Sequence, residues 1–161
     1  GIQIRPLNLQ NLEQELQSIY HLSIISFQHN LLYTPIDLAT FTTQYAQIKP
    51  YLKPELVLLA EQVTQNPPQL VGFLFAIPDL LQAQRGATLD TIIIKTVAVL
   101  PGRTYAGLGS VLVGQVQAIA HQLGYRRAIH ALMQDDNTSR NISDRYAQTI
   151  RRYVLLARDL L

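Results

Sequence analysis

Apolar and polar positions follow two different periods along this chain, and the period changes where Pro, Gly or Asn interrupts it. Short apolar or alternating runs predict β-strands, whereas apolar positions spaced three and four apart predict helices. The predicted strands span residues 2–7, 56–62, 70–77, 88–99, 127–133 and 150–157. The predicted helices span residues 12–28, 36–48, 108–123 and 139–146. This order predicts one α/β domain with a mixed, mostly antiparallel sheet.

Turn and cap residues refine these boundaries. Thr34 and Pro35 predict the start of the second helix, because Thr caps helices and Pro suits the first helical position. The Asn and Pro residues within 65–68 predict a turn that joins two strands into an antiparallel hairpin. Gly72 in the returning strand indicates a bulge. Residues 78–86 predict a loop or a short helical turn.

The most informative segment joins the fourth predicted strand to the third predicted helix. The strand ends at Pro101, and a turn rich in Gly and small residues, 102–109, leads into a helix with a clean apolar stripe that ends at Gly124. The first N–H groups of a helix have no internal partner, and the helix dipole places partial positive charge beside them. Glycines let a ligand approach the backbone closely. This glycine turn therefore predicts a site for a phosphate-bearing ligand.

Three alternatives fit the glycine turn less well. A P-loop requires Lys beside the Ser or Thr, and Gly109-Ser110 has none. A dinucleotide fingerprint requires a third Gly where Leu112 stands, and an acidic residue about 20 positions later, where the chain reads Gly, Tyr, Arg, Arg. The third alternative is a tight turn that begins a helix and binds no ligand.

The turn resembles the acetyl-CoA-binding motif of the GNAT acetyltransferase superfamily. That family has V-x-P at the end of its fourth strand, followed by [Q/R]-x-x-G-x-[G/A] at a helix start. Residues 99–101 read Val-Leu-Pro, and Gly107 and Gly109 fall at the family's offsets from Pro101. The order of predicted elements also matches the family across essentially the whole chain.

Two positions depart from the family pattern. Thr104 stands where the family usually has Gln or Arg, and Arg103, one residue earlier, is the candidate to supply that charge. Tyr105 stands where Gly is common.

The resemblance implies a six- to seven-stranded sheet with helices on both faces, splayed between the fourth and fifth strands. Only one strand is predicted after Tyr146, so the last strand is missing, is supplied by another chain, or lies outside this sequence. Residues 1–161 are expected to form a single domain. Because Gly1 rather than Met begins the chain, we expect a domain excised from a longer protein.

In the family, acetyl-CoA lies in the cleft between the splayed strands. The resemblance places its pantetheine arm along the fourth strand, its pyrophosphate at the glycine turn, and the N–H of Val97 at the thioester carbonyl. Asn137 matches an Asn that commonly contacts the arm, and it is equally suited to cap a helix. The residues implied to bind acetyl-CoA are Val97, Val99, Arg103, Thr104, Tyr105, Ala106, Gly107, Leu108, Gly109, Ser110 and Asn137.

The catalytic residues follow less directly. Many relatives protonate the leaving thiolate with a Tyr on the last helix, and Tyr146 is the candidate here, although it stands nine rather than about seven positions after Asn137. Its alternative role is packing. The family's strand-four Glu is absent, so the base candidates are Asp90, Glu61 and His130. A His on a strand is also often purely structural.

Composition excludes several classes of protein. The chain has no Cys, its four His lack metal-ligand spacing, and no metal is expected. No apolar run reaches the roughly 18 residues of a membrane span, so a cytoplasmic protein is expected. The net charge of +2 is too small to indicate nucleic-acid binding. Residues 1–90 carry 4 Lys+Arg against 7 Asp+Glu, whereas residues 91–161 carry 9 against 4, which favours an anionic ligand near the glycine turn.

The leading hypothesis is therefore an acetyl-CoA-dependent N-acetyltransferase that acts on a primary amine of a small molecule or protein. The alternatives are a non-catalytic acyl-CoA-binding regulatory domain and, less favoured, a nucleotide-binding domain. The acceptor cleft is implied near residues 27–45, where charges are few; Lys95 either contacts an anionic substrate or reaches solvent. The expected partners are this amine and a second copy in a homodimer, not nucleic acid or a membrane.

Overall fold

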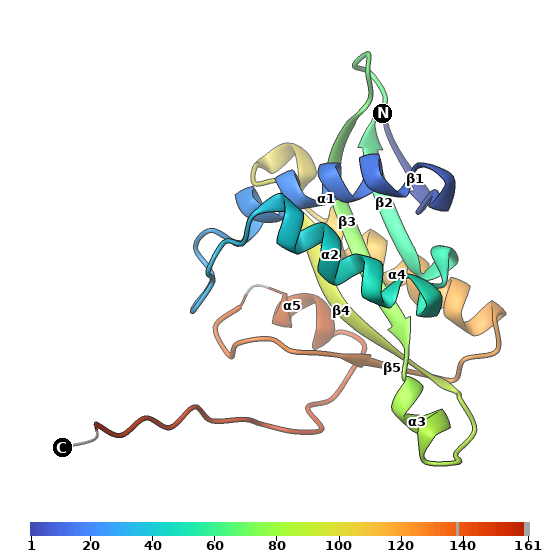
Figure 1. The fold of residues 1–161 in the computed structure, drawn as a ribbon, viewed down its shortest axis with the longest axis vertical. Coiled ribbons are helices and arrows are strands. Elements are labelled where there is room, and N and C mark those ends of the chain that lie inside the picture. The colour runs from blue at the N-terminus through green and yellow to red at the C-terminus, as the bar shows by residue number, and fades with distance from the viewer. Residues whose placement is uncertain (138, 160–161) are drawn as a thin grey trace.

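The sheet forms the centre of the molecule (Figure 1). The computed structural model describes residues 1–137 and 139–159. Neighbouring strands are antiparallel from the first to the fourth, and the fourth and fifth are parallel. The five strands of this sheet, in spatial order, are β1 (Ile2–Pro6), β2 (Val57–Gln62), β3 (Gln69–Pro78), β4 (Thr91–Val99) and β5 (Arg127–His130).

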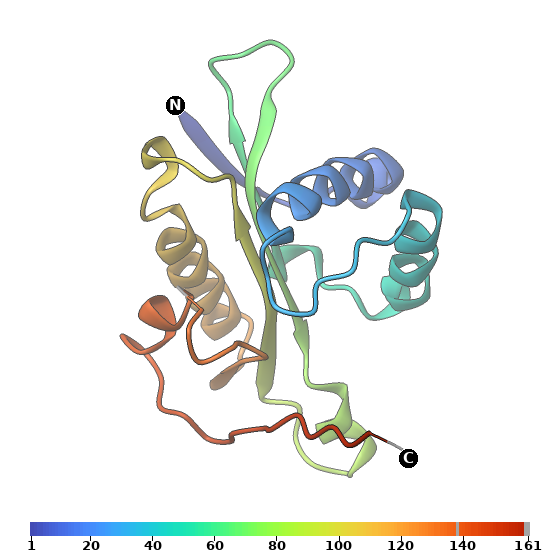
Figure 2. The ribbon, with the colours of Figure 1, turned by 90° about the vertical axis from the view of Figure 1, so that its left-hand side faces the viewer.

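Helices cover both faces of the sheet. Figure 2 shows α1 and α2 against one face and α4 against the other, which confirms the predicted layers. A short 3-10 turn, η4 (Arg103–Tyr105), precedes α4. The α-helices are α1 (Leu12–Phe27), α2 (Leu38–Ile48), α3 (Leu80–Gln84), α4 (Leu108–Gln122) and α5 (Arg140–Ser143). Within the described residues, no helix combines the length and apolar character of a membrane span.

Each face of the sheet has its own apolar core. Leu112 and Val116 of α4 pack against one face, and Leu16 of α1 packs with Phe41 and Phe73 against the other. Full burial of such a side chain stabilises the fold by about 1.5–3 kcal/mol. The two cores fix β4 between α1 and α4, which positions the segment that carries the candidate site.

A charge cluster joins β1 to α1 and β2. Arg5 Nη1 lies 2.8 Å from Glu15 Oε1, and Arg5 Nε donates to Glu61 Oε2 at 3.0 Å. The Glu15 side chain is only 8% exposed, and its Oε2 has no hydrogen-bond partner among the described residues. Arg5 therefore supplies the only cation that the structure shows beside this buried carboxylate.

Four predicted boundaries were wrong. The second helix begins at Leu38, not beside Thr34 and Pro35, because the Asp37 carboxylate caps it by accepting from the Thr40 backbone N–H at 2.8 Å. The fifth strand ends at His130 rather than at position 133. The fourth strand begins at Thr91 rather than at position 88, and the last helix, α5, ends at Ser143 rather than at position 146.

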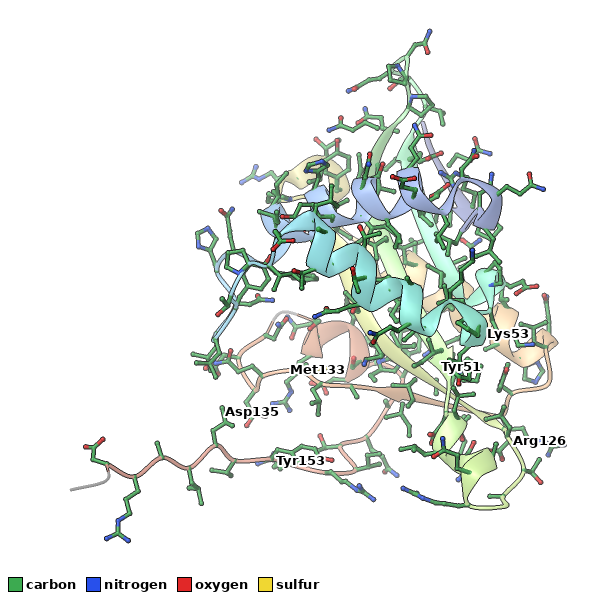
Figure 3. All side chains as sticks on the ribbon, viewed as in Figure 1. Tyr51, Lys53, Arg126, Met133, Asp135 and Tyr153 are labelled. Atoms are coloured by element: carbon green, nitrogen blue, oxygen red, sulfur yellow. The ribbon has the colours of Figure 1, made fainter. Side chains whose placement is uncertain are left out.

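The predicted count of six to seven strands was also wrong, since the described residues contain five. Residues 150–157 form no strand; they are extended and exposed, as Figures 1 and 3 show for the segment that carries Tyr153. Their apolar, β-branched composition favours a strand. A strand also requires a neighbouring backbone to pair with, and this segment has none among the described residues.

Candidate functional site

The sheet opens into a fork between β4 and β5. The two strands pair in register only from Thr91 opposite Arg127 to Ile94 opposite His130. The Ala131 N–H then donates to the Ile94 carbonyl at 3.1 Å, and no further strand pairing is found along residues 95–99 on this side within the described chain. The predicted splay between the fourth and fifth strands is confirmed.

A β-bulge marks the point where the strands part. Phe75 of β3 pairs with Thr96, and the next residue, Ala76, pairs with Ile94, so Lys95 is an extra residue on β4. A bulge bends its strand and disturbs the ladder, which re-aims side chains and ends pairing. A bulge is also present next to Gly72, where one was predicted: the β2 residues Ala60 and Glu61 pair with Gly72 and Leu70, so Val71 is the extra residue on β3.

The fork contains a cavity of about 320 Å³. Its walls come from β4, from α5 and the segment before it, and from the connection between α1 and α2. Lys95 is the one residue among the described lining that carries a permanent charge. The lining residues used below are Phe27, Tyr33, Lys95, Val97, His130, Asn137, Ile142 and Ser143.

The backbone of β4 presents unpaired groups to this cavity. The Leu100 N–H donates to the Val71 carbonyl of β3 at 2.8 Å. Because antiparallel strands bond at alternate residues, Ala98 also bonds β3, and the backbone groups of Val97 and Val99 point to the other edge. The Val99 carbonyl accepts from Ser26 Oγ at 3.3 Å. The N–H groups of Val97 and Val99 and the Val97 carbonyl have no partner among the described residues.

The glycine turn ends in a row of free donors. The Tyr105 N–H donates to Gly102 O and the Ala106 N–H to Arg103 O, so these two amides are used within the turn. Gly107 is left-handed, with φ +85°, and the next internal bond runs from the Val111 N–H to Gly107 O. Between them, the N–H groups of residues 107–110 have no acceptor in the described chain. The donors that could bind an anion at the predicted glycine turn are therefore these four amides, which we call the cradle.

The space around the two glycines fits a close ligand. A Cβ at Gly107 would meet no atom within 4 Å, so the turn is open above that residue. A Cβ at Gly109 would lie 3.1 Å from Ile142 Cδ1 and 3.7 Å from Val97 Cγ1. Gly109 is thus the cradle residue that borders the cavity lining, and a side chain there would crowd Ile142 and Val97.

The other residues that were predicted to bind acetyl-CoA near the turn lie in different environments. Tyr105 packs against the α4-side core, and its hydroxyl donates to Gln62 Oε1 at 2.8 Å, which anchors the turn to β2. Arg103 and Thr104 are exposed beside the cradle. Asn137 lines the cavity, and its Oδ1 accepts from both N and Oγ of Ser139, so it also orders the start of α5.

Three predicted catalytic candidates are not brought into the cavity. Tyr146 is 54% exposed and lies outside the lining, so its role stays a prediction. Glu61 lies on β2, where its carboxylate accepts a hydrogen bond from Arg5 of β1. Asp90 precedes β4, and hydrogen bonds from Gln82, then from Thr91 and Arg127, lower its pKa to about 2. A carboxyl with that pKa is too weak a base to take a proton from an amine near neutral pH.

His130 is the predicted candidate that the structure does bring to the fork. Its Nδ1 lies 2.7 Å from Ser143 Oγ of α5, and its Nε2 lies 3.3 Å from Gln117 Nε2 of α4. Burial lowers the pKa of the imidazole, which favours its neutral form. The two partners were missed because each lies 13 positions from His130 on a separate helix, and no local pattern links them.

The lowered pKa of His130 predicts how stability depends on pH. On acidification below about 6.5 the unfolded imidazole takes up a proton before the folded one, so the free energy of unfolding should fall. His130→Gln should lose this part of the pH dependence, while the three other His act as an unchanged background. Urea unfolding of both proteins at about pH 8 and pH 5.5 checks the difference. Equal losses on acidification in the two proteins would contradict the assignment.

Comparison with known proteins supports the fold. No protein-family model matches the sequence. No curated protein matches it either. Solved structures do match. An acetyltransferase of Trypanosoma brucei is 18% identical, with a TM-score of 0.62 over 98% of this chain and 99% of that one.

Two further structures extend the comparison. An aminoglycoside 6'-N-acetyltransferase of Acinetobacter baumannii is 18% identical, with a TM-score of 0.64 over 99% of both chains. A GNAT family acetyltransferase of Brucella melitensis, in complex with acetyl-CoA, is 19% identical, with a TM-score of 0.62 over 88% of this chain and 80% of that one. In the first two of these structures the match covers nearly the whole length of both chains.

Proposed function

We propose that this chain, which has the fold of the GNAT acetyltransferases, binds acetyl-CoA and transfers the acetyl group to a primary amine of a small molecule or protein. One observation carries the proposal. Unpaired backbone groups run from the amides of residues 107–110, along the edge at Val97 and Val99, to the cavity at the fork. That line suits a ligand with a pyrophosphate at one end and an amide-bearing arm at the other.

Each part of the line has a role in holding such a ligand. The four amides at the start of α4 would donate to phosphate oxygens, and Arg103 would add a nearby positive charge. The Val97 and Val99 backbone would pair with the arm as an added strand pairs with a sheet edge. Asn137 lines the same cavity, and its side-chain nitrogen, which has no acceptor among the described residues, would donate to the same arm. Acetyl-CoA supplies an activated thioester and a thiol leaving group.

The chemistry requires few groups from the protein. The attacking amine must be neutral, so its proton has to leave before the attack. His130 is the predicted base that lies at the fork, but both of its ring nitrogens already have hydrogen-bond partners, Ser143 and Gln117, so we propose that water carries the proton away. The N–H of Val97 would polarise the thioester carbonyl as an oxyanion-hole donor does. Tyr146 remains a candidate acid only if the segment after α5 moves toward the cavity.

The cavity lining favours a particular kind of acceptor. Phe27 and Tyr33 form an edge-to-face aromatic pair on the side of the α1–α2 connection, with ring centroids 6.3 Å apart. Lys95 adds a positive charge, and no Asp or Glu is found among the described lining residues. A polycation such as an aminoglycoside would meet repulsion without compensation here. We therefore propose an amine that is neutral or anionic overall.

Calorimetric titration with acetyl-CoA tests the proposal. We expect a dissociation constant in the micromolar range, followed by thiol release when a panel of amines is added. The panel pairs each amino acid with the amine that lacks its carboxylate, and includes an aminoglycoside and a peptide. Absence of binding at about 1 mM acetyl-CoA, which means less than about 4 kcal/mol of binding free energy, would reject the proposed function.

A second candidate function is a non-catalytic acyl-CoA-binding regulatory domain. It is favoured by the lack of a carboxylate among the described cavity residues and by the position of Tyr146 outside the cavity. This candidate predicts acetyl-CoA binding without thiol release on any amine. Release that requires both acetyl-CoA and a single amine class would exclude it.

A further inference from the structure

Three side chains from three elements meet at the fork. Ser143 of α5 is only 9% exposed, yet it lines the cavity, and its Oγ lies 2.7 Å from His130 Nδ1. Gln117 of α4 holds the opposite side of the ring, with its Nε2 3.3 Å from His130 Nε2. Ser143 is buried and the other two side chains are partly buried, and burying polar groups costs desolvation free energy that apolar side chains in the same place would not.

The orientation of the Gln117 amide decides which ring nitrogen of His130 carries the hydrogen. The side-chain nitrogen of Gln117 can only donate, so Nε2 of the neutral His130 ring accepts from it. The ring hydrogen is then on Nδ1, which donates to Ser143 Oγ. Ser143 Oγ thus receives a hydrogen bond, while its own hydrogen is bonded to no acceptor in the described chain. That hydroxyl is an oriented donor at the wall of the cavity.

The position of this donor matches one atom of the proposed ligand. The cradle lies at the start of α4, and the free edge of β4 leads from Val99 to Lys95, four residues or about 13 Å along a strand. A ligand held by its pyrophosphate at the cradle and by its arm along this edge ends at the fork. His130 is the last residue of β5 that pairs there, and Ser143 is bonded to it. The end of the arm carries the sulfur.

We infer that the Ser143 hydroxyl donates a hydrogen bond to the CoA sulfur and stabilises the negative charge it carries as the leaving thiolate. The inference rests on the proposed function. His130 and Gln117 are positioning residues, because they hold the hydroxyl rather than touch the sulfur. Ser143 keeps its hydrogen throughout, so no proton is transferred and no bond to Ser143 forms. A fixed donor of this kind favours the state in which charge has developed on sulfur.

Binding of CoA and of desulfo-CoA, which lacks the sulfur, tests the inference without turnover. Titrations at about pH 9 place part of the CoA thiol in its thiolate form, because an alkyl thiol titrates somewhat above the roughly 8.5 of a Cys side chain. We expect wild type to bind CoA roughly tenfold more tightly than desulfo-CoA, as a hydrogen bond to a charged group allows. Ser143→Ala should bring the ratio close to one, and Ser143→Thr, which keeps a hydroxyl, should preserve most of it. His130→Leu should lower the ratio by releasing the hydroxyl.

The outcomes separate this inference from the proposed function. If wild type binds neither ligand, the proposed function fails. If it binds both and the ratio is the same in wild type and Ser143→Ala, only the inference is overturned; an unchanged ratio in His130→Leu overturns the positioning role. A second measurement needs no variant: the ultraviolet absorbance of bound CoA reports the thiol pKa. A bound pKa equal to or above that of free CoA would also overturn the inference.

Discussion

Replacement of Gly107 by glutamate is expected to weaken acetyl-CoA binding by about a hundredfold or more. Gly107 opens the row of free amides at the start of α4, and nothing lies within 4 Å of the position a Cβ would take. A carboxylate there would occupy the cradle, accept from its amides and repel the phosphates. The loss of two or more charge-assisted hydrogen bonds is worth about 3 kcal/mol, which corresponds to that factor. Calorimetric titration of both proteins measures the change.

Gly86→Glu is the matched control for this experiment. Gly86 also has a left-handed backbone, with φ +74°, and also has no atom within 4 Å of a Cβ, but it lies in the turn between α3 and β4. Both variants accept the same strain of about 1–2 kcal/mol, so their thermal stabilities should fall alike. Only Gly107→Glu should lose the ligand. Equal losses of affinity in the two variants would show that the cradle does not bind the phosphates.

Arg5→Met is expected to lower the free energy of unfolding by about 2–3 kcal/mol. The change leaves the Glu15 carboxylate, 8% exposed, without its cation, and removal of one partner of a buried ion pair is costly. Glu61 is more exposed and can be rehydrated, which keeps the expected loss below the largest values known for such pairs. Urea denaturation measures the change.

Two further variants make the stability experiment specific. Arg5→Met combined with Glu15→Leu removes both charges and should recover most of the lost stability. Arg127→Met breaks a pair with Asp90 in which the Arg side chain is 66% exposed, and it should cost less than about 1 kcal/mol. A loss in Arg127→Met as large as in Arg5→Met would refute the view that burial of Glu15 sets the cost.

The sequence predicted correctly those features of the fold that depend on residues close together in the chain. The stripe of α4 and the turn before it follow from spacing and from the glycines that the turn requires, so both were predicted correctly. The predicted start of α2 was wrong because the side chains of Thr34 and Asp37 can both cap a helix. The structure uses Asp37, whose carboxylate accepts from both the backbone N–H and the hydroxyl of Thr40.

Pairings between distant segments could not be read from sequence. Residues 150–157 have the composition of a strand, but whether a strand forms depends on a partner. The same holds at the site. The free amides of the cradle follow from a local turn, whereas Gln117 and Ser143 reach His130 only because α4 and α5 pack beside β5. The extra residue at position 95 is defined by the register of β3 and cannot be recognised from β4 alone.

Lys95, the extra residue on β4, also determines which mutations the fork between β4 and β5 tolerates. Since Ile94 and Thr96 pair with consecutive residues of β3, the chain between them is one residue longer than a regular ladder needs. The opening depends on that length and not on the identity of the side chain at position 95. A substitution at position 95 should therefore leave the gap open, whereas deletion of the position would return β4 to even pairing with β3 and favour closure of the sheet.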